Sequence, residues 1–517
     1  MTFEIVFVLL SLLGMMAALI ADKMRPGMVL FSVVVLFLCV GILTPKEMLE
    51  GFSNKGMITV ALLFLVSEGI RQSGTLGQVI KKLLPQGKTT VFKAQLRILP
   101  SVAFISAFLN NTPVVVIFAP IIKHWAKSVK LPATKFLIPL SYVTILGGIC
   151  TLIGTSTNLV VHGMILEAGY EGFTMFELGK VGIFIAIAGI IYLFIFSKRL
   201  LPDARPDTAV PDEEVEEGEK LHRVEAVLGA RFPGINKKLS DFNFQRHYGA
   251  EVKEIKTRNG QRYVDHLEDV VLREGDTLVV MADDTFIPTW GESSVFVLLT
   301  NGNDPDTSGK KKRWLALILL VLMIVGATVG ELPATKEMFP DIKLDMFFFV
   351  CITTIIMAWT NIFPARKYTK YISWDILITI ACAFAISKAM VNSGVADCVA
   401  GFIIGLSDDY GPHVLLAILF VITNLFTELI TNNAAAALSF PIALSVATQL
   451  GVDPTPFFVV ICMAASASFS TPIGYQTNLI VQGIGSYKFT DFVKIGLPLN
   501  LITFLISVFV IPMIWKF

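Results

Sequence analysis

Two short polar segments interrupt apolar stretches of the sequence at a matched spacing. Asn110-Asn111-Thr112 and Thr431-Asn432-Asn433 lie 321 positions apart, and about 46 positions after each comes a second polar break that ends in Thr-Asn. Amide and hydroxyl oxygens are ligands for hard cations, and the N–H groups of a broken helix are donors for anions. Irregular backbone is tolerated in hydrocarbon only where protein or a water-filled cavity satisfies its polar groups. The four breaks therefore predict a central ligand site.

The composition places these segments in a membrane. Of the 517 residues, 54% are hydrophobic and only 16% are charged, with a mean hydropathy of +0.69. In soluble domains about a quarter of the residues are charged. The six cysteines include no Cys-x-x-Cys pair, so neither a disulfide framework nor a zinc site is indicated. Phe3 to Ile20 is followed by Lys23 and Arg25 rather than by a small-residue cleavage site, which favours a retained span.

Ten apolar stretches are predicted to cross the membrane, five in each half of the chain. A span needs roughly 20 apolar residues, and fewer where flanking groups reach the interface. Two further stretches, about 94–121 and 413–446, carry the asparagine segments, so each is expected to be a re-entrant helical hairpin with that segment at its tip. The predicted crossings are the continuous stretches 3–20, 27–43, 57–72, 178–199, 312–330, 344–361, 374–391 and 490–515, and the interrupted stretches 134–166 and 455–482.

An internal repeat relates the halves, which comprise residues 1–201 and 312–517. At an offset of 320 or 321, Asn111 matches Asn432, and the same offset aligns Pro120 with Pro441, Gly154 with Gly474, Asn158 with Asn478 and Gly163 with Gly483. A unit of five crossings leaves the next unit upside down. The predicted fold is an all-α polytopic membrane protein of two inverted repeats, each with five crossings plus a re-entrant hairpin. A small α/β cytoplasmic domain is inserted between them.

Basic residues gather in one set of loops, and the opposite set is acidic or sparse. The basic set is expected to be cytoplasmic. Both termini and the mouth of the second hairpin then lie outside, whereas the first hairpin and the link between the halves lie inside. The basic set comprises Lys23, Arg25, Arg71, Lys81, Lys82, Lys88, Lys93, Lys123, Lys127, Lys130, Lys198, Arg199, Arg366, Lys367, Lys370 and Lys488, and the opposite set holds Glu167, Glu171, Asp397, Asp408, Asp409 and Asp453.

The link between the halves contains a predicted soluble domain. An acidic linker, 202–221, leads into residues 222–299, where apolar and polar positions alternate as in β-strands, and a second polar linker, 300–311, follows. Asn259-Gly260 between two such runs is a strong hairpin signal. The domain is small and poor in clustered His, Cys or Ser/His/Asp sets, so we do not expect an enzyme.

These motifs together resemble the divalent anion/sodium symporter family of the ion transporter superfamily. The membrane resemblance rests on the hairpin tips, the two hairpin prolines and the breaks Gly154-Thr155-Ser156-Thr157-Asn158 and Gly474-Tyr475-Gln476-Thr477-Asn478. The inserted stretch resembles the TrkA-C regulatory domain of potassium-conductance proteins, a pairing typical of a sulfate-permease-like branch. That second resemblance rests on Gly234, Leu239, Tyr248-Gly249, Asn259-Gly260 and Arg273-Glu274-Gly275-Asp276.

The resemblance implies two sodium sites and an anion site between the hairpins. The family carries Ser-Asn-Thr at both tips, and only the central asparagine matches at both tips here. One Na+ would be held by Ser106, Asn110, Asn111 and the backbone around Gly154, and another by Thr427, Asn432 and the backbone around Gly474. The anion would contact Asn111, Thr112, Thr155, Ser156, Asn432, Asn433, Tyr475 and Gln476.

Two departures bear on specificity. Family members commonly have Pro-Pro where this chain has Ser156-Thr157 and Gln476-Thr477, which argues against a standard C4-dicarboxylate substrate. No Lys or Arg occupies a tip or a break, so a dianion there would rely on sodium ions and helix dipoles for its countercharge. Glu428, beside the second tip, is either a proton-coupling carboxylate or a structural group at a helix end.

The sequence thus favours a sodium-coupled symporter of a divalent anion, with Na+ as the coupling ion and no organic cofactor. Sulfate or a related oxyanion comes ahead of a di- or tricarboxylate such as succinate or citrate. The resemblance implies a homodimer with elevator-type alternating access. Proton-coupled anion transport and a ligand-sensing membrane receptor remain alternatives. We expect the protein in a bacterial inner membrane, with a small regulatory ligand on the cytoplasmic domain and no nucleic-acid partner.

Overall fold

The apolar stretches of the first half fold into helices that end where the sequence turns polar. In the computed structural model, the continuous spans predicted in this half become α1, α2, α4 and α10, close to their expected bounds. The helices of this half are α1 (Phe3–Ala21), α2 (Pro26–Val40), α3 (Pro45–Glu50), α4 (Lys55–Gln72), α5 (Thr75–Leu83), α6 (Val91–Ser106), α7 (Asn111–Ser128), α8 (Leu137–Gly148), α9 (Ser156–Glu167) and α10 (Gly179–Leu200).

The second half repeats this order of helices at nearly the same offset. For example, α7 begins at Asn111 and α20 at Asn432, whereas α9 begins at Ser156 and α22 at Gln476. The helices of this half are α13 (Lys310–Gly330), α14 (Pro333–Met338), α15 (Met346–Trp359), α16 (Tyr368–Tyr371), α17 (Trp374–Asn392), α18 (Val395–Gly405), α19 (Gly411–Leu429), α20 (Asn432–Leu450), α21 (Thr455–Ser466), α22 (Gln476–Gly485) and α23 (Phe489–Ile514).

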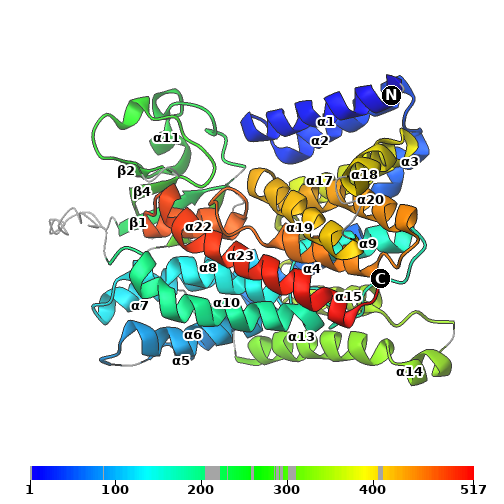
Figure 1. Cartoon of the computed structure of the whole chain (residues 1–517). Coiled ribbons are helices and arrows are strands. Elements are labelled where there is room, and N and C mark those ends of the chain that lie inside the picture. The colour runs from blue at the N-terminus through cyan, green and yellow to red at the C-terminus, as the bar shows by residue number, and fades with distance from the viewer. Residues whose placement is uncertain are drawn as a thin grey trace, which may run out of the picture.

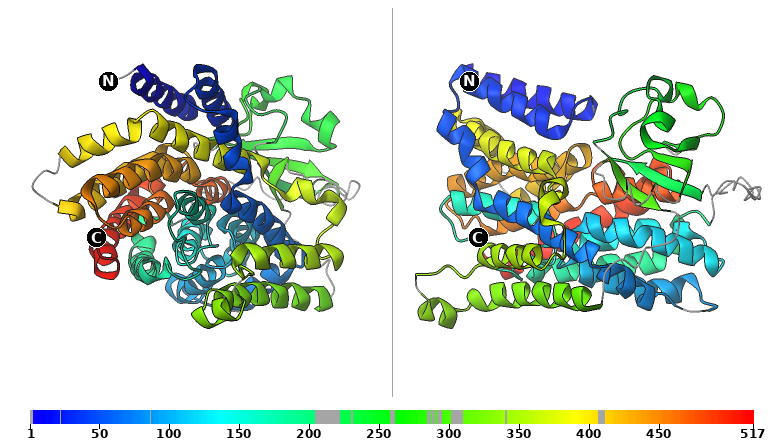
Figure 2. Two further views of the ribbon diagram at one scale, coloured as in Figure 1. Left: turned by 90° about the vertical axis from the view of Figure 1, so that its right-hand side faces the viewer. Right: turned by 180° about the vertical axis from the view of Figure 1, so that it is seen from behind.

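The structure describes residues 3–21, 23–85, 87–203, 222–229, 231–257, 261–283, 286, 290, 295–300, 310–339, 341–405 and 411–517. Both chain termini lie at one end of the helical bundle, and a small sheet lies at the other end (Figure 1). The side and rear views agree (Figure 2). The tips of the two hairpins, α6–α7 and α19–α20, each contact the break of the opposite half.

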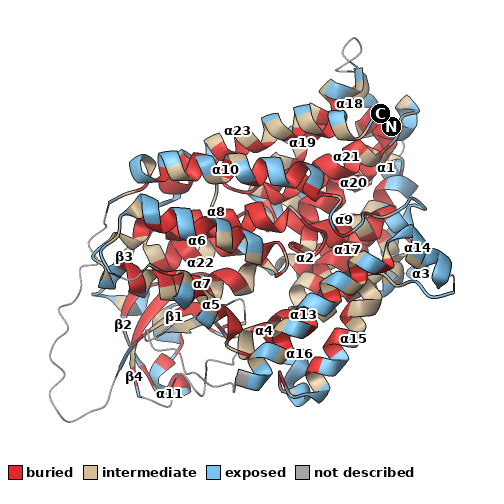
Figure 3. Cartoon of the chain, turned by 90° about the horizontal axis from the view of Figure 1, so that it is seen from below, coloured by how far each residue is buried: buried red, intermediate tan, exposed pale blue. Residues whose placement is uncertain are grey.

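Burial separates the central helices from the outer ones (Figure 3). Within the described chain, eight helices are long and apolar enough to cross a membrane, by length and composition alone. The α20 window is 78% buried inside the protein, whereas the α1 window is only 11% buried and exposes Leu10 and Leu13. An apolar helix that is exposed on this scale needs lipid or another chain against it. The chain is therefore an integral membrane protein with α20 at its centre.

The four predicted breaks are four places where one helix ends and another begins. The chain turns at Asn110 before α7, at Thr155 before α9, at Thr431 before α20 and at Tyr475 before α22. In each case the residue before the helix makes no side-chain hydrogen bond to the helix start, whereas Asn54 caps α4 in the usual way. The first N–H groups of these four helices therefore remain available to a ligand.

The sheet belongs to the segment between the halves. Its strands are β1 (His222–Leu228), β2 (Glu251–Lys256), β3 (Arg262–Tyr263), β4 (Thr277–Ala282) and β5 (Phe296–Thr300), all antiparallel in the order β3-β2-β4-β1-β5. One short helix, α11 (Phe244–Tyr248), packs over it, and Phe232, Phe242 and Phe296 join a separate aromatic core. The β-strands that the alternation predicted within residues 222–299 are present, for example as β1, β2 and β4, whereas the predicted turn at Asn259-Gly260 lies outside the described residues.

Candidate functional site

The starts of α7 and α22 meet across the two halves of the chain. Asn111 Nδ2 donates a hydrogen bond to the Tyr475 hydroxyl over 2.6 Å, and that hydroxyl lies 3.2 Å from Thr155 Oγ1. Thr112 Oγ1 donates to Gln476 Oε1 over 3.3 Å. The first hairpin tip therefore contacts the break of the second half, 364 residues away in sequence.

The second hairpin tip makes the reciprocal contact with the break of the first half. Ser156 Oγ and Thr157 Oγ1 both donate to Asn433 Oδ1, over 3.2 and 3.4 Å. The structure thus gathers at one place seven residues predicted to contact the anion: Asn111, Thr112, Thr155, Ser156, Asn433, Tyr475 and Gln476. The eighth, Asn432, begins α20 beside Asn433 and is 8% exposed.

We define the first tip cluster as Ser106, Asn111, Gly148, Thr151 and Gly154. Ser106 Oγ donates to Asn111 Oδ1 over 2.7 Å, and both side chains are fully buried. A methyl group on Gly148 would lie 2.7 Å from Asn111 Oδ1 and 3.1 Å from the Gly154 carbonyl oxygen. Only glycine leaves room for these two oxygens, which are neutral ligands of the kind that a sodium ion accepts.

The second tip cluster comprises Thr427, Asn432, Ser468, Thr471 and Gly474. Thr427 Oγ1 lies 3.0 Å from Asn432 Oδ1 and donates to the Ala465 carbonyl over 2.6 Å. A methyl group on Gly474 would lie 2.7 Å from the Thr427 carbonyl oxygen and would collide with Ser468 Oγ. The predicted sodium residues Thr427, Asn432 and Gly474 therefore lie together, with one additional hydroxyl oxygen.

Thr151 and Thr471 hold the two unwound breaks in shape, a role that the sequence reasoning missed. Thr151 Oγ1 donates to the Ala107 carbonyl of the first tip and accepts from Gly154 N over 3.1 Å. Thr471 Oγ1 likewise accepts from Gly474 N, over 3.2 Å. The two threonines are 320 positions apart, so the offset that aligned the asparagines also marked them.

Asn158 and Asn478 brace the same breaks from inside the helices that follow. Asn158 Nδ2 donates to the Thr151 carbonyl over 2.9 Å, and Asn478 Nδ2 donates to the carbonyls of Ser468 and Thr471 over 2.9 and 3.1 Å. Each asparagine is fully buried. Their part is to satisfy the unwound backbone, which in hydrocarbon must find partners within the protein.

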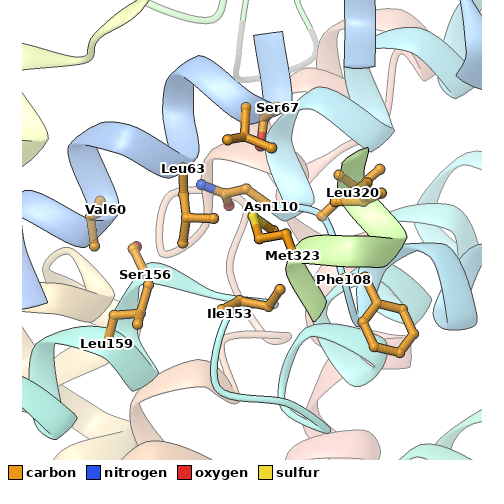
Figure 4. A pocket seen from close by; sticks show the side chains of 12 residues that line it. Val60, Leu63, Ser67, Phe108, Asn110, Ile153, Ser156, Leu159, Leu320 and Met323 are labelled. Atoms are coloured by element: carbon orange, nitrogen blue, oxygen red, sulfur yellow. The ribbon is translucent and has the colours of Figure 1, made fainter. Parts of the chain in front are cut away.

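Asn110 is the one predicted sodium residue whose side chain the structure places elsewhere. It lines a small cavity of about 10 Å³ with residues of α4 and α13, as well as Ser156 (Figure 4). Its neighbours there include Leu63, Ser67 and Met323. The side chain of Asn110 therefore faces the helices beside the hairpin rather than the Ser106–Asn111 pair.

Glu428 occupies the space directly behind the second tip. Its Oε1 accepts hydrogen bonds from Ser470 N over 2.8 Å and from Asn500 Nδ2 over 2.7 Å, and its backbone carbonyl accepts from Thr471. These bonds tie the hairpin tip to the second break and to α23. The other carboxylate oxygen, Oε2, is buried without a hydrogen-bond partner among the described residues, so both interpretations of this carboxylate, the structural role and proton coupling, stay open.

The electrostatics of the site come from neutral groups and helix ends. Among the described hydrogen bonds at the four breaks, none involves Lys or Arg. The positive ends of the helix dipoles of α7, α9, α20 and α22 face the shared site, because all four helices start there. An anion would find N–H donors and partial positive charge, and a cation would find uncharged oxygens.

Comparison with known sequences decides the family. The profile of the citrate transporter family matches residues 16–449 and again 337–517. The chain belongs to the citrate transporter family. Membership agrees with the integral membrane helices and indicates a transporter rather than an enzyme.

Similar proteins cover different shares of the chain. An uncharacterized transporter of Synechocystis is 29% identical over 93% of this chain and 92% of its own length. The transporter YfbS of Escherichia coli is 26% identical over 99% of this chain and all of its own length. Sodium/sulfate cotransporter 2 of Chlamydomonas reinhardtii is 29% identical over 56% of this chain, which is 32% of that protein.

Proposed function

We propose that this protein is a sodium-coupled symporter of a divalent anion, with sulfate or a related oxyanion as the favoured substrate. The observation that carries the proposal is the meeting of four uncapped helix starts around neutral oxygen ligands, without a basic side chain in the described contacts. A dianion in such a site lacks a fixed countercharge. Two sodium ions would supply it, which makes anion binding dependent on the cation.

Each tip cluster would hold one sodium ion. In the first tip cluster the ligands would be Ser106, Asn111 and the Gly154 carbonyl, which surround the space kept open by Gly148. In the second tip cluster they would be Thr427, Asn432 and the backbone around Gly474. The anion would bind between the clusters, against the starts of α7, α9, α20 and α22. Asn111 and Asn432 would serve both an ion and the anion.

Both the residues of the breaks and the similar proteins favour an oxyanion such as sulfate as the substrate. Ser156-Thr157 and Gln476-Thr477 add hydroxyl and amide donors that suit a compact oxyanion. The similarity to a sodium/sulfate cotransporter points the same way. The description of the matched family favours one second candidate, a sodium-coupled carrier of citrate or a dicarboxylate.

The architecture that supports transport is a pair of inverted repeats. The repeated helix order and the two hairpins that point toward each other support this layout. In such a protein the hairpins and broken helices would move together against α4, α13, α15 and α17 in an elevator-type cycle. We propose a homodimer in a bacterial inner membrane, with both termini outside.

The inserted domain at 222–299 is proposed to be a TrkA-C-like regulatory unit in the cytoplasm. Its own aromatic core and five-stranded sheet set it apart from the helical bundle. Regulation by a small ligand would require that ligand to bind one transport state more tightly than another.

The test is uptake into proteoliposomes with sulfate, thiosulfate, phosphate, succinate and citrate, each with a sodium gradient and with choline in place of sodium. Sodium-dependent uptake of sulfate or thiosulfate supports the proposal. Uptake of citrate or succinate alone supports the second candidate. Uptake that is equal in choline and sodium rejects sodium coupling, and binding without uptake of any anion favours a receptor.

A further inference from the structure

The helices that follow the two breaks differ in what covers them. On α9, the face formed by Leu159, His162 and Gly163 borders a cavity of about 1040 Å³ at the end of the bundle away from the sheet. On α22, the positions 320 residues later are Leu479, Gln482 and Gly483. The repeat therefore predicts a second open cavity at the sheet end.

The inserted domain occupies part of that space instead. The turn before β4, Gly275–Thr277, packs on α22: a methyl group on Gly275 would lie 3.7 Å from the Leu479 side chain. A methyl group on Gly483 would lie 2.6 Å from Thr277 Oγ1 and 3.2 Å from the Gly275 carbonyl. The counterpart glycine on α9, Gly163, meets the Asn54 side chain of the membrane helix α4.

The two break helices also differ in their distance from the neighbouring long helices. α9 packs directly on α4, where a methyl group on Gly56 would lie 2.6 Å from the Leu159 carbonyl. The corresponding helices α22 and α17 border a cavity of about 580 Å³, which is lined by Gln476 of α22 and by Trp374 and Asp375 of α17. The larger cavity at the α9 end is lined by none of the eight residues predicted to contact the anion, whereas Gln476 lines the cavity at the α22 end. Helix packing therefore shields the site from the α9 end but not from the α22 end.

The inserted domain contributes Gly229, Arg231 and Glu274 to the wall of this cavity, which Met28 and Phe31 of α2 also line. It is attached to the moving part by an ion pair, since Lys123 Nζ on α7 lies 3.0 and 3.1 Å from the two carboxylate oxygens of Glu225 on β1. Burial alone would raise the pKa of Glu225, but the charges of Lys123 and Lys256 outweigh it and lower that pKa to about 2. The Glu225 carboxylate is thus charged at neutral pH.

A second contact reaches the segment just before α17. Arg231 Nη2 reaches the Ile372 carbonyl over 3.5 Å, the outer limit of a hydrogen bond. The sheet lies against α22 and α7 at this end of the bundle (Figure 1). The domain therefore packs on α22 and is ion-paired to α7, and its residues Arg231 and Glu274 border the cavity between α22 and α17.

We infer that the inserted domain is a wedge that favours the state in which the site opens at the sheet end. Gly275–Thr277 occupies space against α22. α17 would need this space in order to pack on α22 in the way that α4 packs on α9. Closing this end requires the wedge to withdraw. This inference rests on the proposed function, because it assumes that the two ends open in turn.

The test is a cross-linking reporter for closure at the α22 end. Ile376→Cys with Leu479→Cys places thiols at the counterparts of Gly56 and Leu159, in a protein whose native cysteines Cys39, Cys150, Cys351, Cys382, Cys398 and Cys462 are replaced. Lys123→Glu is added to repel Glu225 and release the wedge. Lys127→Glu, on an exposed position of the same helix, is the matched control, and Glu225→Gln is a second release variant.

The reporter protein is expected to cross-link slowly, and Lys123→Glu to speed cross-linking roughly tenfold, the effect of about 1.4 kcal/mol on a two-state balance. Lys127→Glu should leave the rate unchanged. The inference is overturned if the reporter cross-links rapidly without release, or if Lys123→Glu and Glu225→Gln both leave the rate unchanged. Because this readout requires no uptake, it separates failure of the wedge from failure of the proposed transport activity.

Discussion

The two tip clusters share a framework and differ in their oxygen atoms. Thr151 and Thr471 each accept a hydrogen bond from the glycine N–H of their own break. An asparagine in the helix that follows each break, Asn158 or Asn478, donates to the unwound backbone carbonyls. At the position of Gly148 in the first cluster, however, the second cluster has Ser468. The second tip is also tied to Glu428, where the first half has Ala107.

Residues that hold the backbone of the breaks in place therefore differ from residues that set the affinity for sodium. The threonine and asparagine braces satisfy backbone groups that would otherwise be unpaired in hydrocarbon, so both clusters need them. The extra hydroxyl of Ser468 adds an oxygen only to the second cluster. We therefore expect the second cluster to bind sodium more tightly than the first.

The largest effect is expected from Asn111→Ala and Asn432→Ala. Each removes an amide that would serve both an ion and the anion, so uptake should fall by more than about 100-fold. Asn111→Ala also removes the acceptor of the buried Ser106 hydroxyl. Size-exclusion profiles of the purified variants control for assembly. Wild-type uptake in either variant would remove the hairpin tips from the site.

Gly148→Ala should come next, and it tests the two clusters against each other. Its methyl group would lie 2.7 Å from Asn111 Oδ1, so sodium affinity in the first cluster should fall about tenfold or more. Ser468→Gly enlarges the second cluster and should cost less, because it removes one oxygen without blocking the space. Sodium titrations of uptake measure both variants. An equal or larger loss in Ser468→Gly would contradict the steric account.

Ser106→Ala and Thr427→Ala are expected to raise the sodium concentration for half-maximal uptake. The increase should be about tenfold for Ser106→Ala and smaller for Thr427→Ala, because Ser468 supplies a further oxygen only in the second cluster. Anion affinity at saturating sodium should change little in both. Unchanged sodium dependence would refute the assignments, and a larger effect at Thr427 would reverse the predicted order of the clusters.

Asn110→Ala should have the smallest effect of the tip variants. Its side chain faces the small cavity beside α4 and α13, so sodium dependence should shift by less than about threefold, within the range of a peripheral contact. Asn111→Ala is the matched comparison, one residue along the same tip. A loss as large as that of Asn111→Ala would restore the sodium role that the sequence predicted for Asn110.

Hydropathy and the repeat predicted the helices well because both depend on local composition. The bounds of α1, α4 and α17 follow from where apolar residues stop, and matched polar residues marked all four breaks. The direction of the Asn110 side chain could not be predicted in this way. Two adjacent asparagines at a helix start look alike in sequence, and only the packing of α13 against the tip separates them.

Contacts between segments far apart in sequence also could not be predicted from hydropathy or from the repeat. The role of Gly148 depends on the approach of Asn111 Oδ1, and the docking of Gly275–Thr277 depends on a face of α22 that resembles any other helix face in sequence. The 320-residue offset was the one long-range signal available. It aligned Thr151 with Thr471, although the hydrogen bonds were needed to show what these residues do.

Equilibrium binding of the transported anion to the purified protein, measured as sodium replaces choline at constant ionic strength, tests the central claim most directly. The account predicts that anion affinity rises steeply with sodium and is lost in choline, because the site relies on cations for countercharge. It also predicts that Ser106→Ala and Thr427→Ala each make the rise less steep. Equal anion affinity in choline and sodium would contradict the account.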